Sequence, residues 1–348
     1  MTTTANNAIP NVTDRLKEIE KTAAAYSGAP IVDRSFQADL ERTVRLALRE
    51  DLGIEEGTLH RYMVAAGESP LEAGETAALQ ELLNKDVTSA SIISPAATAR
   101  AVMLAKTPGV VAGLEVAKFV FRSLDPHCEI ELLWGEGEEI LTAPHPIAII
   151  KGNARALLVA ERTALNLIQR MSGIATTAHK FAVQAREKGI AVVDTRKTTP
   201  GLRTLEKYAV QAGGAANHRY GLFDAILIKD NHIRVAGGVS QAIQLARRHF
   251  PCMPVEVEAA NFQDIDEALA ENAEKIMLDN MTPEQIKQAV AVIDQRTSDA
   301  GHRPVIEVSG GVNADNFASY LIDGVNAISI GALTHSVRSM DISLNIEV

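Results

Sequence analysis

The chain has 348 residues, of which 46% are hydrophobic and 22% charged, and its formal net charge is −10. These values are typical of a soluble globular protein with one large domain and a smaller one. The negative charge argues against general binding to nucleic acid or to acidic membrane surfaces, although it allows a local cationic pocket. The sequence contains no apolar run long enough to span a bilayer and no signal-peptide pattern. Cys128 and Cys252 lack metal-ligand neighbours, so we expect two core thiols and a cytoplasmic protein.

The first half of the chain predicts an extension followed by a small α+β domain. Residues 1–35 are polar and rich in alanine, which predicts a loosely held N-terminal extension. Apolar residues recur with helical spacing over residues 37–51, and residues 54–85 are interpreted as a surface helical insertion. Short strands and turns then surround a predicted helix over residues 116–124. We therefore expect an α+β sandwich domain over residues 36–152.

The rhythm of the sequence changes near Asn153. A long helix is predicted from Ala154 to Met171, and Ser172 with Gly173 is expected to end it. Six short apolar runs then alternate with amphipathic helical stretches; the runs begin at Ala191, Ala225, Val255, Lys275, Val305 and Ala327. Such strands indicate a parallel sheet buried on both faces. Glycine-rich loops after the last two strands favour a β/α barrel, with an open doubly wound sheet as the alternative.

Charged or small polar residues follow these strands in an order set by sign. Cations come first, carboxylates follow, and glycine loops come last; the positions are Arg196, Lys197, His218, Arg219, Lys229, Glu258, Asp279, Ser309 and Gly331. The C-terminal ends of the strands of a β/α barrel open onto one mouth, where ligands bind. Any single charge after a strand is more often a solvated loop residue or a helix cap. The ordered series predicts a ligand site instead.

The cations of this series would repel each other at one mouth unless an anion neutralised them. A dicarboxylate or a sugar phosphate would do so, and arginine binds planar carboxylates through two parallel hydrogen bonds. The alternative is that nearby acids, such as Asp194, Asp224 and Asp230, pair with these cations.

Glu258 and Asp279 end consecutive predicted strands, so they should be neighbours at the rim. Two carboxylates that face phosphates suggest a shared Mg²⁺, although a general acid/base pair is an alternative. Glycines after the last two strands let backbone N–H groups approach a phosphate closely, whereas the simpler interpretation is a turn. By pattern alone, Arg162 is a solvated charge in the middle of a helix.

Several blocks of the sequence match a known family in order and spacing: Glu161-Arg-Thr-Ala-Leu-Asn, Asp194-Thr-Arg-Lys-Thr-Thr-Pro-Gly, Asn217-His-Arg, Leu227-Ile-Lys-Asp-Asn-His, Val255-Glu-Val-Glu, Ser309-Gly-Gly-Val and Gly331-Ala-Leu-Thr-His-Ser. Together they resemble the quinolinate phosphoribosyltransferase family. The resemblance implies an incomplete, seven-stranded β/α barrel over residues 153–335 and a C-terminal segment, 336–348, that returns to the smaller domain. It also implies a homodimer, with the hexamer as a further assembly, in which the neighbouring subunit completes each active site.

The resemblance also implies roles for single residues. The residues that match the quinolinate-binding cations are Arg196, Lys197, His218, Arg219 and Lys229, and Arg162 resembles the arginine donated across the dimer interface. Glu258 and Asp279 match the residues that position Mg²⁺ and the ribose of phosphoribosyl pyrophosphate. The remaining expected substrate-binding positions are Thr195, Ser309, Gly310, Gly311, Ile330, Gly331 and Ala332. The expected catalytic residues are Lys197, Lys229, Glu258 and Asp279.

The activity implied is phosphoribosyl transfer to quinolinate with decarboxylation, which forms nicotinate mononucleotide for de novo NAD synthesis. Mg²⁺ bound with phosphoribosyl pyrophosphate is expected, and no organic cofactor. The alternatives are a related transferase for another aromatic acid, a barrel enzyme that uses Lys229 as a Schiff-base nucleophile, and a non-catalytic protein that kept the fold. The sequence departs from the family pattern in the long stretch between Gly53 and Asp86, and in having Lys85 where glycine is usual.

Overall fold

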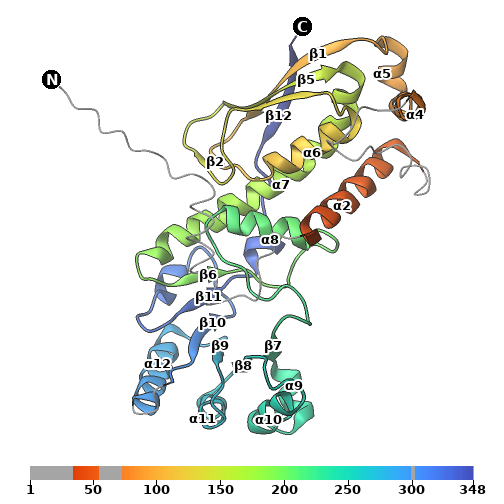
Figure 1. The fold of residues 1–348 in the computed structure, drawn as a ribbon. Helices are drawn as coiled ribbons and strands as arrows, with labels where there is room; N and C mark the ends of the chain where they lie inside the picture. Colours follow the sequence, from red (N-terminus) through yellow and green to blue (C-terminus); the bar gives the residue numbers. More distant parts are fainter. Residues whose placement is uncertain (1–33, 55–72, 299–301, 348) are drawn as a thin grey trace, which may run out of the picture.

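The computed structural model describes residues 34–54, 73–298 and 302–347. They form an upper part built on an antiparallel sheet and a lower part built on a parallel sheet, connected by one long helix (Figure 1). Residues 1–33 of the predicted extension over residues 1–35, and most of the predicted insertion over residues 54–85, lie outside the described residues, whereas Arg34 and Ser35 begin the first described helix.

The upper part holds a four-stranded antiparallel sheet in the order β12-β1-β5-β3. Its strands are β1 (Thr98–Ala105), β3 (Glu129–Leu132), β5 (His145–Asn153) and β12 (Ile342–Glu347), and β2 (Gly109–Val110) pairs separately with β4 (Glu139–Ile140). On β1 the buried residues Ala101, Met103 and Ala105 alternate with less buried ones, as in a sheet with one covered face. The last strand of the chain, β12, pairs with β1 from Arg100–Glu347 to Ala105–Ile342.

Among the described residues, four helices lie in the first part of the chain: α2 (Arg34–Leu52), α4 (Ala73–Leu83), α5 (Val87–Ile92) and α6 (Leu114–Leu124). The helices predicted over residues 37–51 and 116–124 are confirmed as α2 and α6. The short helix α5 was not predicted; it begins after Asp86, whose carboxylate accepts the backbone N–H groups of Thr88 and Ser89. In the described part of the insertion, α4 buries Leu79, Leu82 and Leu83, so one face of it belongs to the core.

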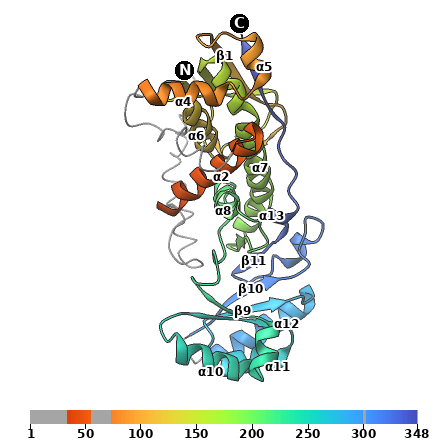
Figure 2. The ribbon, with the colours of Figure 1, turned by 90° about the vertical axis from the view of Figure 1, so that its right-hand side faces the viewer.

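Helix α7 (Ala154–Arg186) passes from the upper sheet to the lower one (Figures 1 and 2). The side chain of Asn153 caps its start by accepting the N–H groups of Arg155 and Ala156. The prediction that the helix ends at Met171 was wrong, because α7 continues through Gly173 to Arg186. A Cβ atom at Gly173 would lie 2.4 Å from the carbonyl oxygen of Arg338. This glycine therefore permits close packing of the C-terminal segment rather than ending the helix.

The lower part is a six-stranded parallel sheet in the order β6-β11-β10-β9-β8-β7. Its strands are β6 (Ala191–Val193), β7 (Ile226–Ile228), β8 (Val255–Ala259), β9 (Lys275–Asp279), β10 (Val305–Ser309) and β11 (Ala327–Ser329). The intervening helices are α8 (Arg203–Ala212), α9 (Asp230–Ala236), α10 (Val239–His249), α11 (Phe262–Ala270) and α12 (Pro283–Thr297), followed by a 3₁₀ helix, η1 (Phe317–Tyr320), and α13 (Ala332–His335). The six predicted apolar runs are these six strands.

The strand order identifies the sheet as an incomplete barrel. The last strand, β11, pairs with the first, β6, which is the order of a ring rather than of a doubly wound sheet. A seventh segment adds one parallel bridge, between Val193 and Ala216, on the other side of β6. Within the described residues, no strand pairing joins Ala216 to β7, so the ring stays open there. The predicted β/α fold is confirmed.

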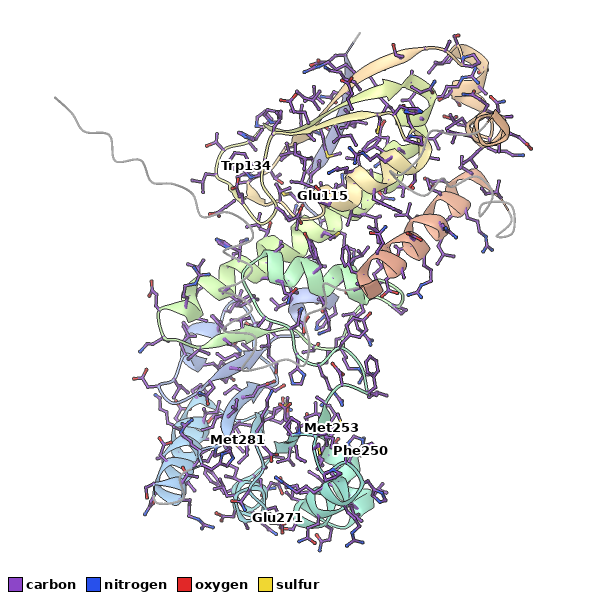
Figure 3. The ribbon with its side chains drawn as sticks, in the orientation of Figure 1. Glu115, Trp134, Phe250, Met253, Glu271 and Met281 are labelled. Atoms are coloured by element: carbon purple, nitrogen blue, oxygen red, sulfur yellow. The ribbon has the colours of Figure 1, made fainter. Side chains whose placement is uncertain are left out.

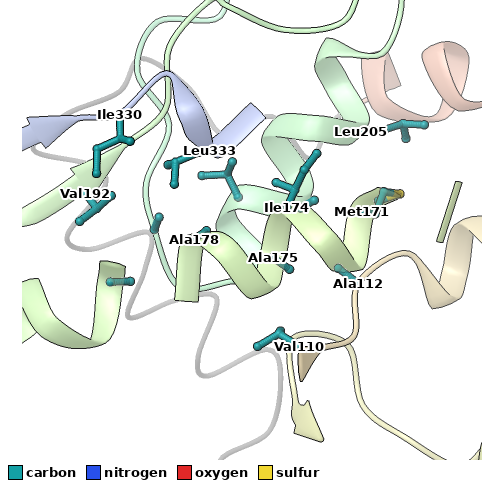
Figure 4. Packing of buried hydrophobic residues seen from close by; sticks show 14 of the residues in the cluster. Val110, Ala112, Met171, Ile174, Ala175, Ala178, Val192, Leu205, Ile330 and Leu333 are labelled. Atoms are coloured by element: carbon teal, nitrogen blue, oxygen red, sulfur yellow. The ribbon is translucent and has the colours of Figure 1, made fainter. Parts of the chain in front are cut away.

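One continuous apolar core connects the two parts. In Figure 4, Val110 and Ala112 of the upper part lie on one side of Met171 and Ala175, and Leu333 of the lower part lies near Ile174 and Ala178 of the same helix. Figure 3 places Trp134 and Glu115 in the upper part and Met281 and Phe250 in the lower part. The prediction of two core thiols was wrong for Cys252, which is exposed, whereas Cys128 is buried. Among the described helices, none is both long and apolar enough to cross a membrane.

Candidate active site

The predicted site residues lie where the strands of the parallel sheet end. Thr195, Arg196 and Lys197 follow β6, and His218 and Arg219 follow the segment that bridges to it. Lys229 follows β7, Glu258 lies near the end of β8, and Asp279 ends β9. Ser309, Gly310 and Gly311 come at the end of β10, and Ile330, Gly331 and Ala332 follow β11. Because the strands are parallel, these positions all belong to one mouth.

Two guanidinium groups lie close together in this mouth. The Nε atom of Arg196 is buried without a hydrogen-bond partner among the described residues. Arg219 is buried, and its Nη1 donates to the carbonyl oxygen of Ala225 at 3.0 Å. Burial, and then the neighbouring positive charge of Arg196, lowers the pKa of Arg219. An anion that binds here would relieve both the desolvation and the repulsion.

Two of the acids that were considered as internal partners, Asp194 and Asp224, are occupied elsewhere, and Asp230 forms no ion pair among the described residues. Asp194 pairs with Lys207, whose Nζ lies 2.5 Å from its Oδ1, and both side chains are fully buried. Asp224 accepts the backbone N–H groups of Tyr220 and Gly221. In the described parts of the chain, no carboxylate lies within ion-pair distance of Arg196, Lys197 or Arg219. The cations therefore stay available for a ligand, with His218 and Lys229 as the exceptions.

Asp194 holds the two cation-bearing loops together. Besides Lys207, its Oδ1 accepts the backbone N–H of His218 at 2.8 Å, and the amide nitrogen of Asn217 faces its Oδ2. Lys207 also donates to the carbonyl oxygen of His218 at 2.9 Å. Burial raises the pKa of Asp194 and lowers that of Lys207, while their mutual attraction opposes both shifts. A buried pair of this kind is costly to break, because each charge would lose its partner.

His218 faces the barrel interior, where two buried carboxylates approach its Nε2. The distances are 3.2 Å to Glu256 and 3.5 Å to Glu307. Its other ring nitrogen, Nδ1, accepts the backbone N–H of Arg219 at 2.7 Å. Burial opposes the charged form, but Glu307 and Glu256 outweigh it, so the pKa of His218 is raised. Both ring nitrogens thus contact protein groups, and the predicted binding of quinolinate by His218 stays a prediction.

The ligand atoms of His218, Glu256 and Glu307 lie within 4.8 Å of one another, which is close enough to hold a metal ion. A metal on Nε2 would require a proton on Nδ1, because a neutral imidazole carries one N–H. Nδ1 instead accepts an N–H, which leaves Nε2 as the protonated nitrogen of the neutral ring. Nε2 therefore faces Glu256 as a donor, whereas both oxygens of Glu307 are buried without a hydrogen-bond partner among the described residues.

Glu258 stands between a cation and a second carboxylate. Its Oε1 lies 2.7 Å from Nζ of Lys229. Burial, and then the negative charge of Glu258, raises the pKa of Asp279 at the end of the next strand. Asn280 donates to Asp279 at 2.6 Å. The two carboxylates are hard oxygen donors with an excess of negative charge between them, so they fit a Mg²⁺ ion.

Two glycines allow the loops of the mouth to approach each other. Gly310 has φ +92°, and a Cβ atom there would lie 2.3 Å from Oδ1 of Asn280. A Cβ atom at Gly331 would lie 3.0 Å from Cδ of Lys197 and 3.1 Å from the ring of His335. The glycine loop after β10 therefore abuts the end of β9, and the loop after β11 abuts the lysine stem. Side chains at either position would separate the walls of the mouth.

Comparison with known proteins agrees with this architecture. The model of the quinolinate phosphoribosyl transferase N-terminal domain matches residues 86–172, and that of the C-terminal domain matches residues 174–345. The chain belongs to the quinolinate phosphoribosyltransferase family. The boundary between the two matched regions falls within α7, at the point where the helix leaves the upper part.

The match with this chain covers most of the length of individual relatives in this family. The chain is 42% identical over 264 residues to a Methanocaldococcus jannaschii protein named probable nicotinate-nucleotide pyrophosphorylase (carboxylating), covering 75% of this chain and 91% of that one. It is 40% identical over 262 residues to the nicotinate-nucleotide pyrophosphorylase (carboxylating) of Mycobacterium leprae, with the same coverage of 75% and 91%. A solved structure of the nicotinate-nucleotide pyrophosphorylase from Francisella tularensis superposes with a TM-score of 0.70 at 35% identity, covering 78% of this chain and 95% of that one.

Arg162, which only the family resemblance had singled out, lies on α7 away from the mouth. Its side chain is exposed, and it has no ion pair or hydrogen bond with any residue that the structure describes. Arg170, two turns further along α7, is the residue of this helix that reaches Thr199 and Thr334 beside the mouth. Arg162 therefore makes no hydrogen bond or ion pair with the residues of the mouth of its own chain.

Sequence reasoning assigned no role to three buried charged residues of the site. Glu256 and Glu307 lie in the middle of apolar strands, one residue out of step with Val255, Val257, Ile306 and Val308. Lys207 lies on the buried face of α8. A charge in a strand that is otherwise buried on both faces is the signal that could have found the two glutamates. Lys207 carries no comparable signal, since its helix is amphipathic with charges on several positions.

Proposed function

We propose that the chain transfers the phosphoribosyl group of phosphoribosyl pyrophosphate to quinolinate with decarboxylation, forming nicotinate mononucleotide, pyrophosphate and CO₂ in de novo NAD synthesis. Family membership and the names of the relatives support this activity. The observation that carries it is the pair of neighbouring guanidinium groups, Arg196 and Arg219, which have no carboxylate partner among the described residues and lie at the same mouth as Glu258 and Asp279. A doubly charged acid fits the first pair, and a sugar pyrophosphate with its metal fits the second.

The cations of the mouth bind and orient quinolinate. Each arginine can donate two parallel hydrogen bonds to a carboxylate, and every charge-assisted bond contributes roughly 1.5–3 kcal/mol. The ring nitrogen of quinolinate is a poor nucleophile, so holding it in line with the anomeric carbon supplies much of the rate enhancement. Lys197, exposed at the front of the mouth, lies beside the loop of Gly331 and is placed to meet negative charge on either substrate.

Glu258 and Asp279 would hold Mg²⁺ with the sugar pyrophosphate, and the ion would supply positive charge to the leaving pyrophosphate. The two carboxylates also stabilise the positive charge that develops at the anomeric carbon. Backbone N–H groups of the loops at Gly310, Gly311 and Gly331 bind the 5-phosphate.

The bond changes balance without an organic cofactor. The ring nitrogen forms a bond to the anomeric carbon while the bond from that carbon to pyrophosphate breaks. The ring nitrogen then carries a positive charge, which accepts the electron pair released when the bond to the 2-carboxylate breaks. CO₂ leaves, and the ring carbon takes up one proton. The cationic wall that bound the carboxylates also excludes water from these steps.

Each active site is completed by a second copy of the chain in a homodimer, which can assemble further into a hexamer. The support is Arg162, an exposed cation on α7 that makes no hydrogen bond or ion pair with the described residues of its own chain. Arg162→Ala and Arg219→Ala would each be inactive as pure proteins. A mixture, after dissociation and reassociation, should recover about a quarter of the activity, because random pairing gives half mixed dimers with one intact site each. Failure of every mixture to recover activity would reject the shared site.

The decisive assay follows pyrophosphate and CO₂ release with quinolinate and phosphoribosyl pyrophosphate, with and without Mg²⁺. Equal amounts of both products, released only when the metal is present, are expected. Nicotinate serves as the matched control substrate, because it has one carboxylate and can give pyrophosphate without CO₂. Turnover of nicotinate in preference to quinolinate would reject the proposal. Trapping of a carbonyl substrate on Lys229 by borohydride would instead favour a Schiff-base enzyme. The cytoplasmic location stays a prediction from sequence.

A further inference from the structure

The loops after β6 and β11 are joined behind the mouth by the side chain of Thr334. Its hydroxyl donates to the carbonyl oxygen of Lys197 at 2.8 Å and lies 3.3 Å from that of Gly331. Thr334 is fully buried, so no water replaces these contacts. The hydroxyl therefore fixes the backbone that carries the Lys197 cation to the start of the loop after β11.

Arg170, a residue of α7, makes a second connection between the same two loops. Arg170 donates through Nη2 to Oγ1 of Thr199 at 2.7 Å and to the carbonyl oxygen of Thr334 at 3.3 Å. Its Nε and Nη2 also donate to Oε1 of Glu206, at 2.9 and 2.6 Å. Glu206 is buried and accepts the backbone N–H of Thr199 through its other oxygen, at 3.1 Å. One arginine thus connects the loop after β6, helix α8 and helix α13.

The two loops also touch at the front of the mouth. A Cβ atom at Gly331 would lie 3.0 Å from the stem of Lys197. The loops are therefore in contact on the ligand side and bonded together on the far side, through residues that do not face the ligand. Such supporting contacts set the position of binding groups to within fractions of an ångström.

We propose that Thr334, Arg170 and Glu206 are positioning residues that hold the loop of Lys197 and the loop of Gly331 at a fixed separation, so that one change behind the mouth weakens the binding of both substrates. This inference rests on the proposed function, in which the first loop meets quinolinate and the second meets the sugar phosphate. Substitution of a residue that supported one subsite alone would change KM for one substrate only.

Thr334→Val tests the inference, with Thr334→Ser as the matched control. Valine keeps the shape of threonine but leaves the buried carbonyl of Lys197 without its donor, whereas serine keeps the hydroxyl. We expect Thr334→Val to raise KM for quinolinate and KM for phosphoribosyl pyrophosphate about tenfold each. Thr334→Ser should keep both values within about twofold of the wild type. An increase in only one KM, or equal values for the valine and serine variants, would overturn the inference.

A second pair of variants covers the case in which Thr334→Val does not fold. Arg170 is partly exposed, with 29% of its side chain accessible, so Arg170→Gln should fold. We expect it to raise both KM values, and Arg170→Lys to recover part of the loss through its ion pair with Glu206. Hydrogen exchange of the unliganded proteins gives a measurement that does not depend on activity. Amides of residues 195–202 should exchange faster in Thr334→Val and Arg170→Gln, with β8 and β9 unchanged.

The two measurements separate this inference from the proposed function. A wild-type protein that does not turn over quinolinate rejects the function. Unchanged exchange over residues 195–202 in both disruptive variants rejects the positioning role, whatever the activity of the wild type.

Discussion

Lys229 and Glu258 form an ion pair across two neighbouring strands, with 2.7 Å between Nζ and Oε1. Lys229 follows β7 and is half exposed, whereas Glu258 is nearly buried in β8. Burial raises the pKa of Asp279, and repulsion by Glu258 raises it further. The pair is therefore the point at which the cationic side of the mouth meets its carboxylate side. A ligand that brings both a metal and a carboxylate would give each of these groups a new partner.

Substitution of Glu258 by glutamine should separate metal binding from folding. Glutamine keeps the shape and one acceptor for Lys229 but removes the charge. We expect kcat to fall by about 10²-fold or more, as for the loss of other preorganised charges, and the Mg²⁺ concentration for half-maximal rate to rise. Steady-state rates over a Mg²⁺ titration measure both. Glu284→Gln, at an exposed position of α12, is the control and should match the wild type. An unchanged metal dependence of Glu258→Gln would contradict the proposed metal site.

The cluster of His218, Glu256 and Glu307 predicts how the free energy of unfolding depends on pH. Burial, and then the charge of Glu256, raises the pKa of Glu307 from 4.5 to about 7. The folded protein therefore binds more protons than the unfolded chain between these values, so stability falls as pH rises from 4.5 to about 7. The raised pKa of His218 acts in the same direction, since its contribution is present below pH 6.5 and is lost as pH rises through the folded pKa. The loss attributable to Glu307 is on the order of 3 kcal/mol.

Glu307→Gln checks this sign. The Tm of the wild type should fall between pH 5 and pH 8, and the Tm of the variant should fall less, because glutamine does not ionise. Thermal unfolding of both proteins in matched buffers measures the difference, which includes the part of the raised pKa of His218 that Glu307 causes. Parallel curves, or a steeper fall in the variant, would contradict the assignment of a buried, proton-holding Glu307.

The sequence predicted the parts of the site that depend on strand periodicity. Arg196, Lys229, Glu258 and Asp279 lie at strand ends, and parallel strands bring such positions to one mouth whatever the details of packing. Contacts between elements were not predictable in this way. Gly173 has the pattern of a helix end, but its reason is the nearby backbone of Arg338, which no local pattern contains.

The same limit explains why the partners in the buried ion pairs could not be predicted from the sequence. Asp194 was considered as a partner for the adjacent arginine, yet it pairs with Lys207 of the following helix. The choice depends on the direction in which α8 turns its buried face, and periodicity does not give that direction. Cys252 shows the converse, since a thiol with no sequence partner was assumed to be in the core and lies exposed. Arg162 depended entirely on the family resemblance, because an exposed helix charge has no local signature.

Loss of Lys207 should be among the most destabilising changes in the chain. Lys207→Met fills the same space but leaves Asp194 buried without its cation, and a buried pair broken in this way costs roughly 3–5 kcal/mol. We expect a correspondingly lower free energy of unfolding in urea. The control is Lys188→Met, which removes the exposed ion pair with Asp323 and should cost less than about 1 kcal/mol. Equal effects of the two variants would show that the buried pair adds nothing beyond a surface pair.

The glycine loop after β10 provides a matched test of backbone approach. Gly310 and Gly311 both have positive φ, of +92° and +67°, so alanine is strained at either position by roughly 1–2 kcal/mol. They differ in what the added Cβ would meet. At Gly310 it would lie 2.3 Å from Oδ1 of Asn280 and 2.9 Å from the backbone nitrogen of the same residue, whereas at Gly311 it would meet nothing within 4 Å.

Because backbone cannot move aside as a flexible side chain can, Gly310→Ala should push the loop away from the end of β9. We expect KM for phosphoribosyl pyrophosphate to rise at least tenfold in Gly310→Ala and clearly less in Gly311→Ala, while both variants lose a similar amount of stability from the φ strain. Kinetics at saturating quinolinate, together with thermal unfolding, measure the two effects separately. If Gly311→Ala weakened sugar-phosphate binding as much as Gly310→Ala, the backbone conformation itself, rather than contact with Asn280, would be what the loop requires.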